Sequence, residues 1–269
     1  RLAVVGSMSG AEDANHIADR IRQDLELDET WYEKSRSARE SFSHIRSQLE
    51  KCGVLVMMSG IVGKNTHRRL DVNEFRAFAM CDDWAPLLFI NSADSNTAKL
   101  FSLLHEVAHI WIGKSDLFND RQGRTMGVRK SETLCNAVAG ELLVPRNVFL
   151  ARWNHTGADV QEKISQFAQD FRCGEIVIAR KALDYNKIKP EIYHQVVQTS
   201  IAIYNRVKTE KEAKGGDYYN TMGSRLDGCF VRALCESISL GRTTYTEAYR
   251  LTNTSRQTEV DRRQAGGLV

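Results

Sequence analysis

The sequence has little that would place it in a membrane or in an oxidising compartment. No apolar run approaches the roughly 18 residues that span a bilayer, and no signal peptide is visible. The six cysteines form no CxxC pair, and most lie in apolar stretches, as reduced thiols do. We therefore expect a cytoplasmic protein with no membrane association. Because the chain begins at Arg1 rather than Met, we also expect a leader or an N-terminal domain to precede it.

An excess of charge of either sign is also lacking. The chain has 37 Lys and Arg against 34 Asp and Glu, a net charge of +3, which does not by itself require a nucleic-acid partner. The basic residues of one polar, glycine-containing segment are Arg121, Arg124, Arg129 and Lys130. Such a loop could bind a nucleic-acid effector or an acidic partner, but a solvated loop is the better interpretation.

What is present is an ordinary globular composition. Hydrophobic residues make up 42% of the 269 residues and charged residues 26%, which is enough to build a core. This length is long for a single domain and is sufficient for two domains. No internal repeat and no low-complexity tract is visible.

The most informative feature is the pentapeptide His-Glu-Val-Ala-His at residues 105–109, within an otherwise apolar stretch. Residues four apart lie on one face of a helix, so His105 and His109 can bind a single Zn²⁺. Glu106, one position round the helix, can then act on a water as general base. The alternative is a pair of packed or hydrogen-bonded core histidines. Burying two His and one Glu without a metal or such bonds would be costly.

A second helix is predicted over residues 131–145, with its apolar residues on one face and a proline at its end. Glu132 near its start offers a third ligand, and two His with one carboxylate are typical of catalytic rather than structural zinc sites. Asn136, one turn later, could hydrogen-bond the outer nitrogen of a ligating histidine. Glu141 and Cys135 are the alternative ligands. Glu141 faces away from Glu132, and Cys135 is better explained as a small core residue.

Four segments follow one another in order between residues 45 and 190. They are Glu-Phe-Arg-Ala-Phe at 74–78, Ala-Pro-Leu-Leu-Phe-Ile-Asn at 85–91, Phe-Ser-Leu-Leu-His-Glu-Val-Ala-His at 101–109, and the helix of residues 132–145. As an ordered set they resemble the ImmA/IrrE metallopeptidases. That family commonly has a second acidic residue where Leu134 stands, which favours Glu132 as the ligand here. It more often has Ala at position 135 and Phe at position 138, and Cys135 and Val138 keep that face apolar.

The resemblance implies a gluzincin-like zinc protease that acts in regulation. Its Zn²⁺ would be held by His105, His109 and Glu132, and Glu106 would move the proton from water to the leaving amine. Members typically cleave or inactivate a helix-turn-helix repressor, which switches on genes of mobile elements, stress responses or phage defence. Such a repressor is therefore the expected partner.

A non-proteolytic regulator is the alternative function, in which zinc stabilises a scaffold that binds DNA or a protein partner. Glu106 favours catalysis, because a scaffold has no use for a general base. For the oxyanion, the sequence offers only His155 and Tyr245, and a structural role is the better interpretation for both. The apolar run Leu87 to Asn91 reads as a strand, and as an edge strand it could pair with an extended substrate.

The periodicity predicts an α+β fold in which a small mixed or antiparallel sheet packs on the zinc-binding helices. We expect a peripheral segment at 1–35 and a metallopeptidase domain at 36–157. Within that domain, the pattern predicts a helix at 36–51, a strand at 54–58 and one or two strands within 72–90.

Two helical units are expected after the peptidase domain. Residues 158–190 look like a helix-turn-helix that packs on the protease, with its second helix running from Glu175 to Tyr185. Arg180 and Lys181 lie on that helix as DNA recognition would need. However, the helix begins with Glu175 and apolar residues rather than base-reading ones. Residues 191–269 are expected to form a helical C-terminal module that acts as a sensor or a substrate-binding cap.

Overall fold

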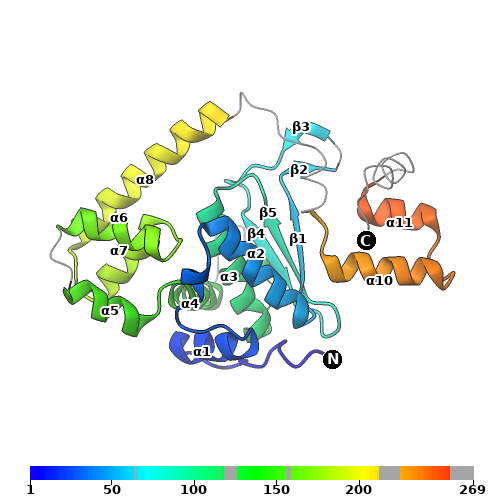
Figure 1. Ribbon diagram of the computed structural model, residues 1–269, viewed down its shortest axis with the longest axis horizontal. Helices are drawn as coiled ribbons and strands as arrows, with labels where there is room; N and C mark the ends of the chain where they lie inside the picture. Colours follow the sequence, from blue (N-terminus) through cyan, green and yellow to red (C-terminus); the bar gives the residue numbers. More distant parts are fainter. Residues whose placement is uncertain (64, 115, 118–125, 156–158, 212–224, 255–269) are drawn as a thin grey trace.

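The computed structural model describes residues 1–63, 65–114, 116–117, 126–155, 159–211 and 225–254. A mixed sheet lies beside the first four helices, and two further groups of helices extend to opposite sides of this centre (Figure 1). The α+β fold class is therefore confirmed. Among the described residues, no helix is both long and apolar enough to cross a membrane.

The main sheet has four strands in the order β1-β5-β4-β6. Their bounds are β1 (Leu55–Ser59), β4 (Ala77–Met80), β5 (Leu87–Asn91) and β6 (Asp116–Leu117). Strands β1 and β5 are parallel, whereas β4 is antiparallel to both of its neighbours. A separate antiparallel hairpin pairs β2 (Ile61–Val62) with β3 (Asn65–Arg69), and the sequence pattern did not predict it.

Strand β5 lies in the interior of the sheet, so the prediction of a free edge at Leu87–Asn91 is wrong. Its two sides pair with β1 and β4, which leaves no backbone edge for a substrate. Leu88 and Ile90 are fully buried, on the sheet face that packs against the motif helix. The outer side of β4 faces away from β5 and pairs with β6 at Phe78 and Ala79.

Helix α3 (Asn96–Ile112) carries the His-Glu-Val-Ala-His motif through the middle of the core. The Ser95 side chain accepts a hydrogen bond from the Ala98 N–H and so caps its N-terminus. Every residue from 102 to 112 is buried, because the sheet, α2 (Ala38–Lys51) and α4 (Met126–Leu143) surround this part of the helix. Gly113 ends the helix with a φ of 77°, and a Cβ there would lie 2.9 Å from Gly6 Cα.

The N-terminal segment is part of this core, so the prediction of a peripheral segment at residues 1–35 is wrong. Helix α1 (Ala14–Asp24) packs on α3 and α4 with Ile17 and Ile21 fully buried. In the short helix η1 (Trp31–Lys34), the Trp31 indole N–H donates to the Leu142 carbonyl at 3.1 Å. The apolar residues of α1 lie on one face of an amphipathic helix, and polar residues separate them in the sequence. The segment is therefore polar by composition although its apolar face is buried in the core.

The second group of helices begins with α5 (Arg146–His155) and contains the predicted helix-turn-helix pair. Both of its helices are present, as α6 (Val160–Asp170) and α7 (Glu175–Asp184). The turn between them places Arg172 in the left-handed region at φ 57°. A long helix, α8 (Pro190–Lys211), then packs along α7.

The third group is a pair of helices, α10 (Gly228–Ser239) and α11 (Tyr245–Thr252). The residue before α10, Asp227, bonds the edge strand β1. The Asp227 side chain is fully buried and caps α10 by accepting from the N–H groups of Cys229 and Phe230. Its other oxygen accepts from the Val56 N–H of β1 at 2.9 Å. Because β1 is an edge strand, this carboxylate supplies a partner that a neighbouring strand would otherwise provide.

Replacing Asp227 by Ala is expected to lower the free energy of unfolding by about 2–4 kcal/mol, because it removes a cap and leaves a buried N–H unsatisfied. Asp159→Ala is the matched control, since Asp159 caps α6 through two N–H groups but is exposed and reaches no strand. It should cost about 1 kcal/mol. Urea unfolding measures both, and equal losses would show that the bond to β1 contributes nothing.

Candidate metal centre

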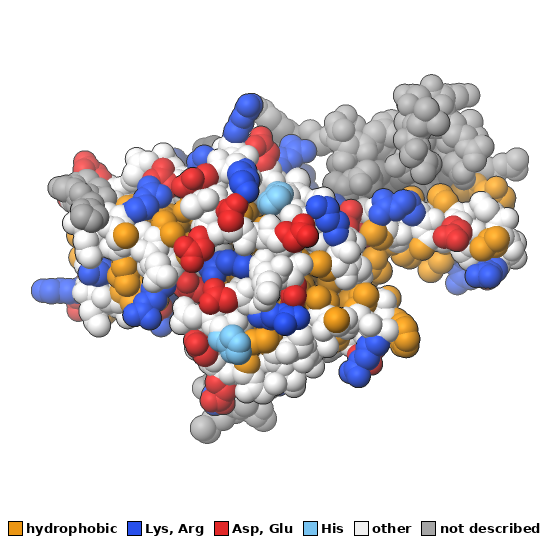
Figure 2. All heavy atoms as spheres, turned by 60° about the horizontal axis from the view of Figure 1, so that its bottom comes forward, with side chains coloured by type: hydrophobic (Ala, Val, Ile, Leu, Met, Phe, Trp, Pro, Cys, Tyr) orange, Lys and Arg blue, Asp and Glu red, His pale blue; other side chains and the backbone are white. Residues whose placement is uncertain are grey.

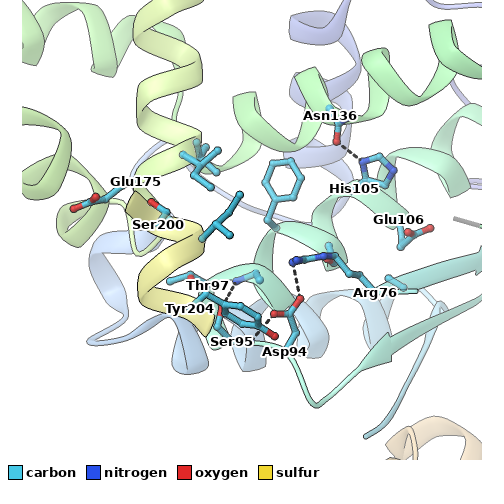
Figure 3. A pocket seen from close by; sticks show the side chains of 18 residues that line it. Arg76, Asp94, Ser95, Thr97, His105, Glu106, Asn136, Glu175, Ser200 and Tyr204 are labelled. Carbon is cyan, nitrogen blue, oxygen red and sulfur yellow. Dashed lines mark hydrogen bonds and ion pairs between the residues drawn. The ribbon is translucent and has the colours of Figure 1, made fainter. Parts of the chain in front are cut away.

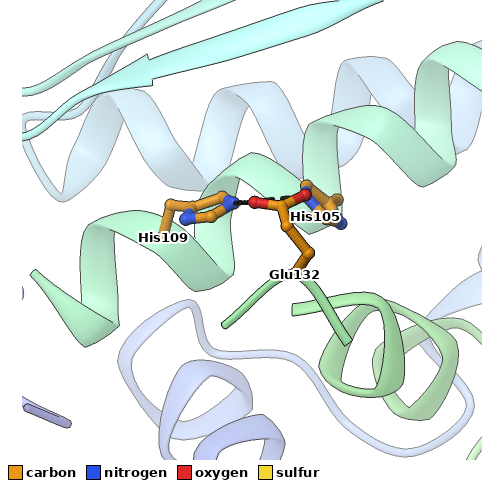
Figure 4. Close-up of side chains that lie close together, drawn as sticks. All are labelled: His105, His109 and Glu132. Carbon is orange, nitrogen blue, oxygen red and sulfur yellow. Dashed lines mark hydrogen bonds and ion pairs between the residues drawn. The ribbon is translucent and has the colours of Figure 1, made fainter. Parts of the chain in front are cut away.

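Three buried side chains from two helices converge on one point. His105 and His109 lie one turn apart on α3, and Glu132 on α4 faces them (Figure 4). His105 Nε2 and His109 Nε2 are 3.2 Å apart, and each lies 3.3 Å from one oxygen of the Glu132 carboxylate. Among the described residues, no other group of His, Cys, Asp and Glu comes together as a candidate metal site.

These three residues fit a zinc ion in both donor type and spacing. Two ligand atoms held tetrahedrally by bonds of about 2.0–2.1 Å are about 3.3 Å apart, which matches the separations found here. The donor set contains two imidazole nitrogens and one carboxylate, the combination that catalytic zinc sites use. The described structure therefore brings together the three residues that the sequence singled out as ligands.

The electrostatics of the group keep its carboxylate ionised. Burial by itself raises the pKa of Glu132, but the hydrogen bonds and charges of His105 and His109 outweigh it and hold the pKa below its usual value. A carboxylate must be deprotonated to bind a metal, so Glu132 is ready to act as a ligand.

Asn136 orients one of the two histidines. Its Oδ1 lies 2.9 Å from Nδ1 of His105, which turns Nε2 of that ring toward His109 and Glu132. This is the position that the sequence predicted for Asn136, one turn after Glu132 on α4. The corresponding Nδ1 of His109 is buried and has no hydrogen-bond partner among the described residues. The two rings are therefore held differently, one by a hydrogen bond and the other by packing.

Replacing Asn136 by Ala is expected to weaken zinc binding about 10- to 100-fold, because His105 loses the contact that sets its ring orientation. Competition with a chromophoric chelator measures the Kd for zinc. Asn154→Ala serves as a control, because Asn154 is exposed on α5 and, among the described residues, accepts a hydrogen bond from the Lys187 side chain alone. A Kd for Asn136→Ala equal to that of the control would show that packing alone orients His105.

A cleft of about 530 Å³ opens beside the metal centre, with Glu106 and His105 in its wall (Figure 3). Glu106 is only 1% exposed. On one side, Arg76 reaches toward Asp94, and the two form an ion pair of 2.7 Å. The opposite side belongs to α7 and α8, with Tyr204 of α8 approaching Asp94. The cleft therefore lies between the metal centre and the helices α7 and α8.

The sequence did not single out Arg76, Tyr204 or the part of α8 that lines this cleft. Arg76 lies in the Glu-Phe-Arg-Ala-Phe segment that carried the family resemblance, so a signal for it was available. Nothing in the local sequence marks Tyr204, which lies 99 positions after His105 and reaches the cleft through the packing of α8.

The alternative ligands do not join the metal centre. Cys135 is fully buried in the core. Glu141 instead accepts a hydrogen bond from Lys181 Nζ at 2.5 Å and lies 3.8 Å from the Arg22 guanidinium. Lys181, at 7% exposure, is therefore turned inward to α4 and does not present its charge to DNA. On the same helix, Arg180 is paired with Asp184.

The remaining candidates from the sequence lie elsewhere. Tyr245 is 57% exposed on α11 and is not among the cleft residues, and the side chain of His155 lies outside what the structure describes. Arg121 and Arg124 also fall outside the described residues, whereas Lys130 is exposed and paired with Glu12. On the face shown in Figure 2, acidic and basic side chains are interspersed rather than gathered by sign.

Comparison with known families gives two matches. The model of Peptidase_M78, described as an IrrE N-terminal-like domain, matches residues 49–183, which run from the end of α2 to α7. The model of a domain of unknown function (DUF8813) matches residues 226–261, which include α10 and α11. A search among curated proteins finds no match to the chain.

Proposed function

Because the chain belongs to the IrrE N-terminal-like peptidase family (Peptidase_M78), we propose that it is a zinc-dependent endopeptidase of a regulatory system. The observation that carries this proposal is the position of Glu106. This carboxylate lines the same cleft as His105, one residue from a three-donor group that fits zinc. A purely structural zinc site has no need of a further carboxylate in an open cleft.

In the proposed reaction, each residue has a separate task. His105, His109 and Glu132 would hold Zn²⁺, which when bound supplies a Lewis acid that polarises the scissile carbonyl and acidifies water. Glu106 takes a proton from the attacking water and delivers it to the nitrogen of the leaving amine as the C–N bond breaks. Asn136 keeps His105 in the orientation that directs Nε2 to the shared site.

We propose a helix-turn-helix transcriptional repressor as the substrate, because the family that this chain resembles typically acts on such proteins. Cleavage would then derepress genes of a stress response, a mobile element or phage defence. Since a repressor acts on DNA in the cytoplasm, the proposal also places this protein there. On α7, Lys181 is buried against Glu141 and Arg180 is paired with Asp184, so the repressor rather than DNA is the proposed partner.

Co-expression with a helix-turn-helix repressor, chosen from the genes next to the one that encodes this chain, tests this proposal. Wild type and Glu106→Gln are compared in cells, with and without DNA damage, and the repressor is followed by immunoblot. Loss of the repressor band with the wild type alone is the expected result. An intact band under every condition, with zinc bound, would favour the non-proteolytic regulator.

A further inference from the structure

One wall of the cleft beside the metal centre is apolar and comes from α7 and α8. It contains Ile176 and Val177 at the start of α7 and Ile201 in the middle of α8. Ile201 is 51% exposed although it is a large aliphatic residue, and it lines the cleft. An exposed apolar side chain inside a cleft is typical of a ligand-binding surface.

This apolar wall is continuous with the catalytic side of the cleft. Phe101 of α3 lies between them, one turn before His105, and the centroids of the Phe101 and His105 rings are 6.4 Å apart. A second cleft shares Phe101, Ile176 and Val177 with the first, so these three side chains contribute to the lining of both clefts. The surface is therefore longer than one side chain and suits an extended polypeptide.

Apart from the metal centre and Glu106, the acidic groups that line the cleft have protein partners. Asp94 is paired with Arg76, and Glu175 at the start of α7 accepts a hydrogen bond from the Ser165 hydroxyl at 2.6 Å. A charged substrate side chain placed against Ile176, Val177 and Ile201 would lose its water without gaining a partner. An apolar side chain placed there would gain the free energy of burial.

We propose that the apolar wall formed by Ile176, Val177 and Ile201 is a specificity subsite for a large apolar side chain next to the scissile bond. The occupant is an extended segment of the substrate protein that carries Leu, Ile, Met or Phe at that position. The inference rests on the proposed endopeptidase function. It gives the helix-turn-helix unit and α8 a role in substrate selection.

Ile201 and Ile203 provide a matched pair for the test. Both lie on α8, and they are 51% and 50% exposed, but only Ile201 lines the cleft. Ile201→Asp and Ile203→Asp therefore introduce the same charge on the same helix at similar exposure. Thermal unfolding followed by circular dichroism checks that both variants keep the fold.

The probes are quenched ten-residue peptides that are identical except for Leu, Phe, Ala or Asp on either side of the central bond. With zinc-loaded wild type, we expect kcat/KM to be about 10- to 100-fold higher for Leu and Phe than for Asp. Ile201→Asp should lose this preference, whereas Ile203→Asp should keep it. Binding of the same labelled peptides to zinc-loaded Glu106→Gln, measured by fluorescence anisotropy, gives a second readout that needs no turnover.

The two readouts separate this inference from the proposed function. Equal cleavage of the Leu and Asp peptides by wild type, or equal loss of preference in both variants, would overturn the subsite. If wild type cleaves no peptide but Glu106→Gln binds Leu more tightly than Asp, and adding Ile201→Asp removes this difference, the wall binds an apolar peptide side chain and the peptidase proposal fails. Absence of both cleavage and selective binding would overturn both.

Discussion

Replacing Glu106 by Gln is expected to lower kcat/KM for peptide cleavage by about 10²- to 10⁴-fold, the usual contribution of a general base. Gln has nearly the shape of Glu but cannot accept the proton of the attacking water. Since Glu106 is 1% exposed, an isosteric change keeps the packing around α3 intact. Steady-state kinetics on a cleaved peptide, with zinc content by atomic emission, measure both properties on one preparation.

The control for this prediction is Glu162→Gln, which removes one exposed carboxylate from α6, away from the cleft. It should match the wild type in both rate and zinc content. Full activity of zinc-loaded Glu106→Gln would reject the general-base role. A variant that loses its zinc would instead show that Glu106 supports the metal centre.

Glu132 and Glu141 are both buried on α4, but their removal is expected to affect different properties. Loss of Glu132 should affect zinc binding, and loss of Glu141 should affect stability. Glu132→Ala should weaken zinc binding by more than the 10- to 100-fold expected for loss of an outer-shell contact, because a direct ligand is lost. Glu141→Ala should lower the free energy of unfolding by about 3–5 kcal/mol, because Lys181 stays buried without its carboxylate, whereas Arg22 keeps its ion pair with Asp19. Folded Glu141→Ala should still bind zinc.

Zinc titration and urea unfolding of both variants test this crossed pattern. The double variant Glu141→Leu/Lys181→Met is the control for the buried pair, since it removes both charges. It should recover most of the lost stability, because the cost arises from an unpaired charge rather than from a lost attraction. Zinc retained by Glu132→Ala and lost by Glu141→Ala would transfer the third ligand position to Glu141.

Local rules were sufficient to predict the parts of this protein that depend on short spacings. The four-residue interval between His105 and His109 places both rings on one face of a helix wherever that helix lies. The same rule relates Glu132 to Asn136, and the structure brings His105, His109 and Glu132 to one point, with Asn136 on the outer nitrogen of His105. Boundaries such as the end of α3 at Gly113 follow from the backbone freedom of a single residue.

The tertiary structure alone decided which segments meet. Whether a strand is central or at an edge depends on its neighbours, so the place of β5 between β1 and β4 could not be inferred from its own residues. The buried group of Arg22, Glu141 and Lys181 joins α1, α4 and α7, and charged residues by themselves predict a solvated surface. Ile201 reaches the cleft only because α8 packs along α7. Long-range packing is a sum of many weak contacts between distant segments, and no local pattern in the chain encodes it.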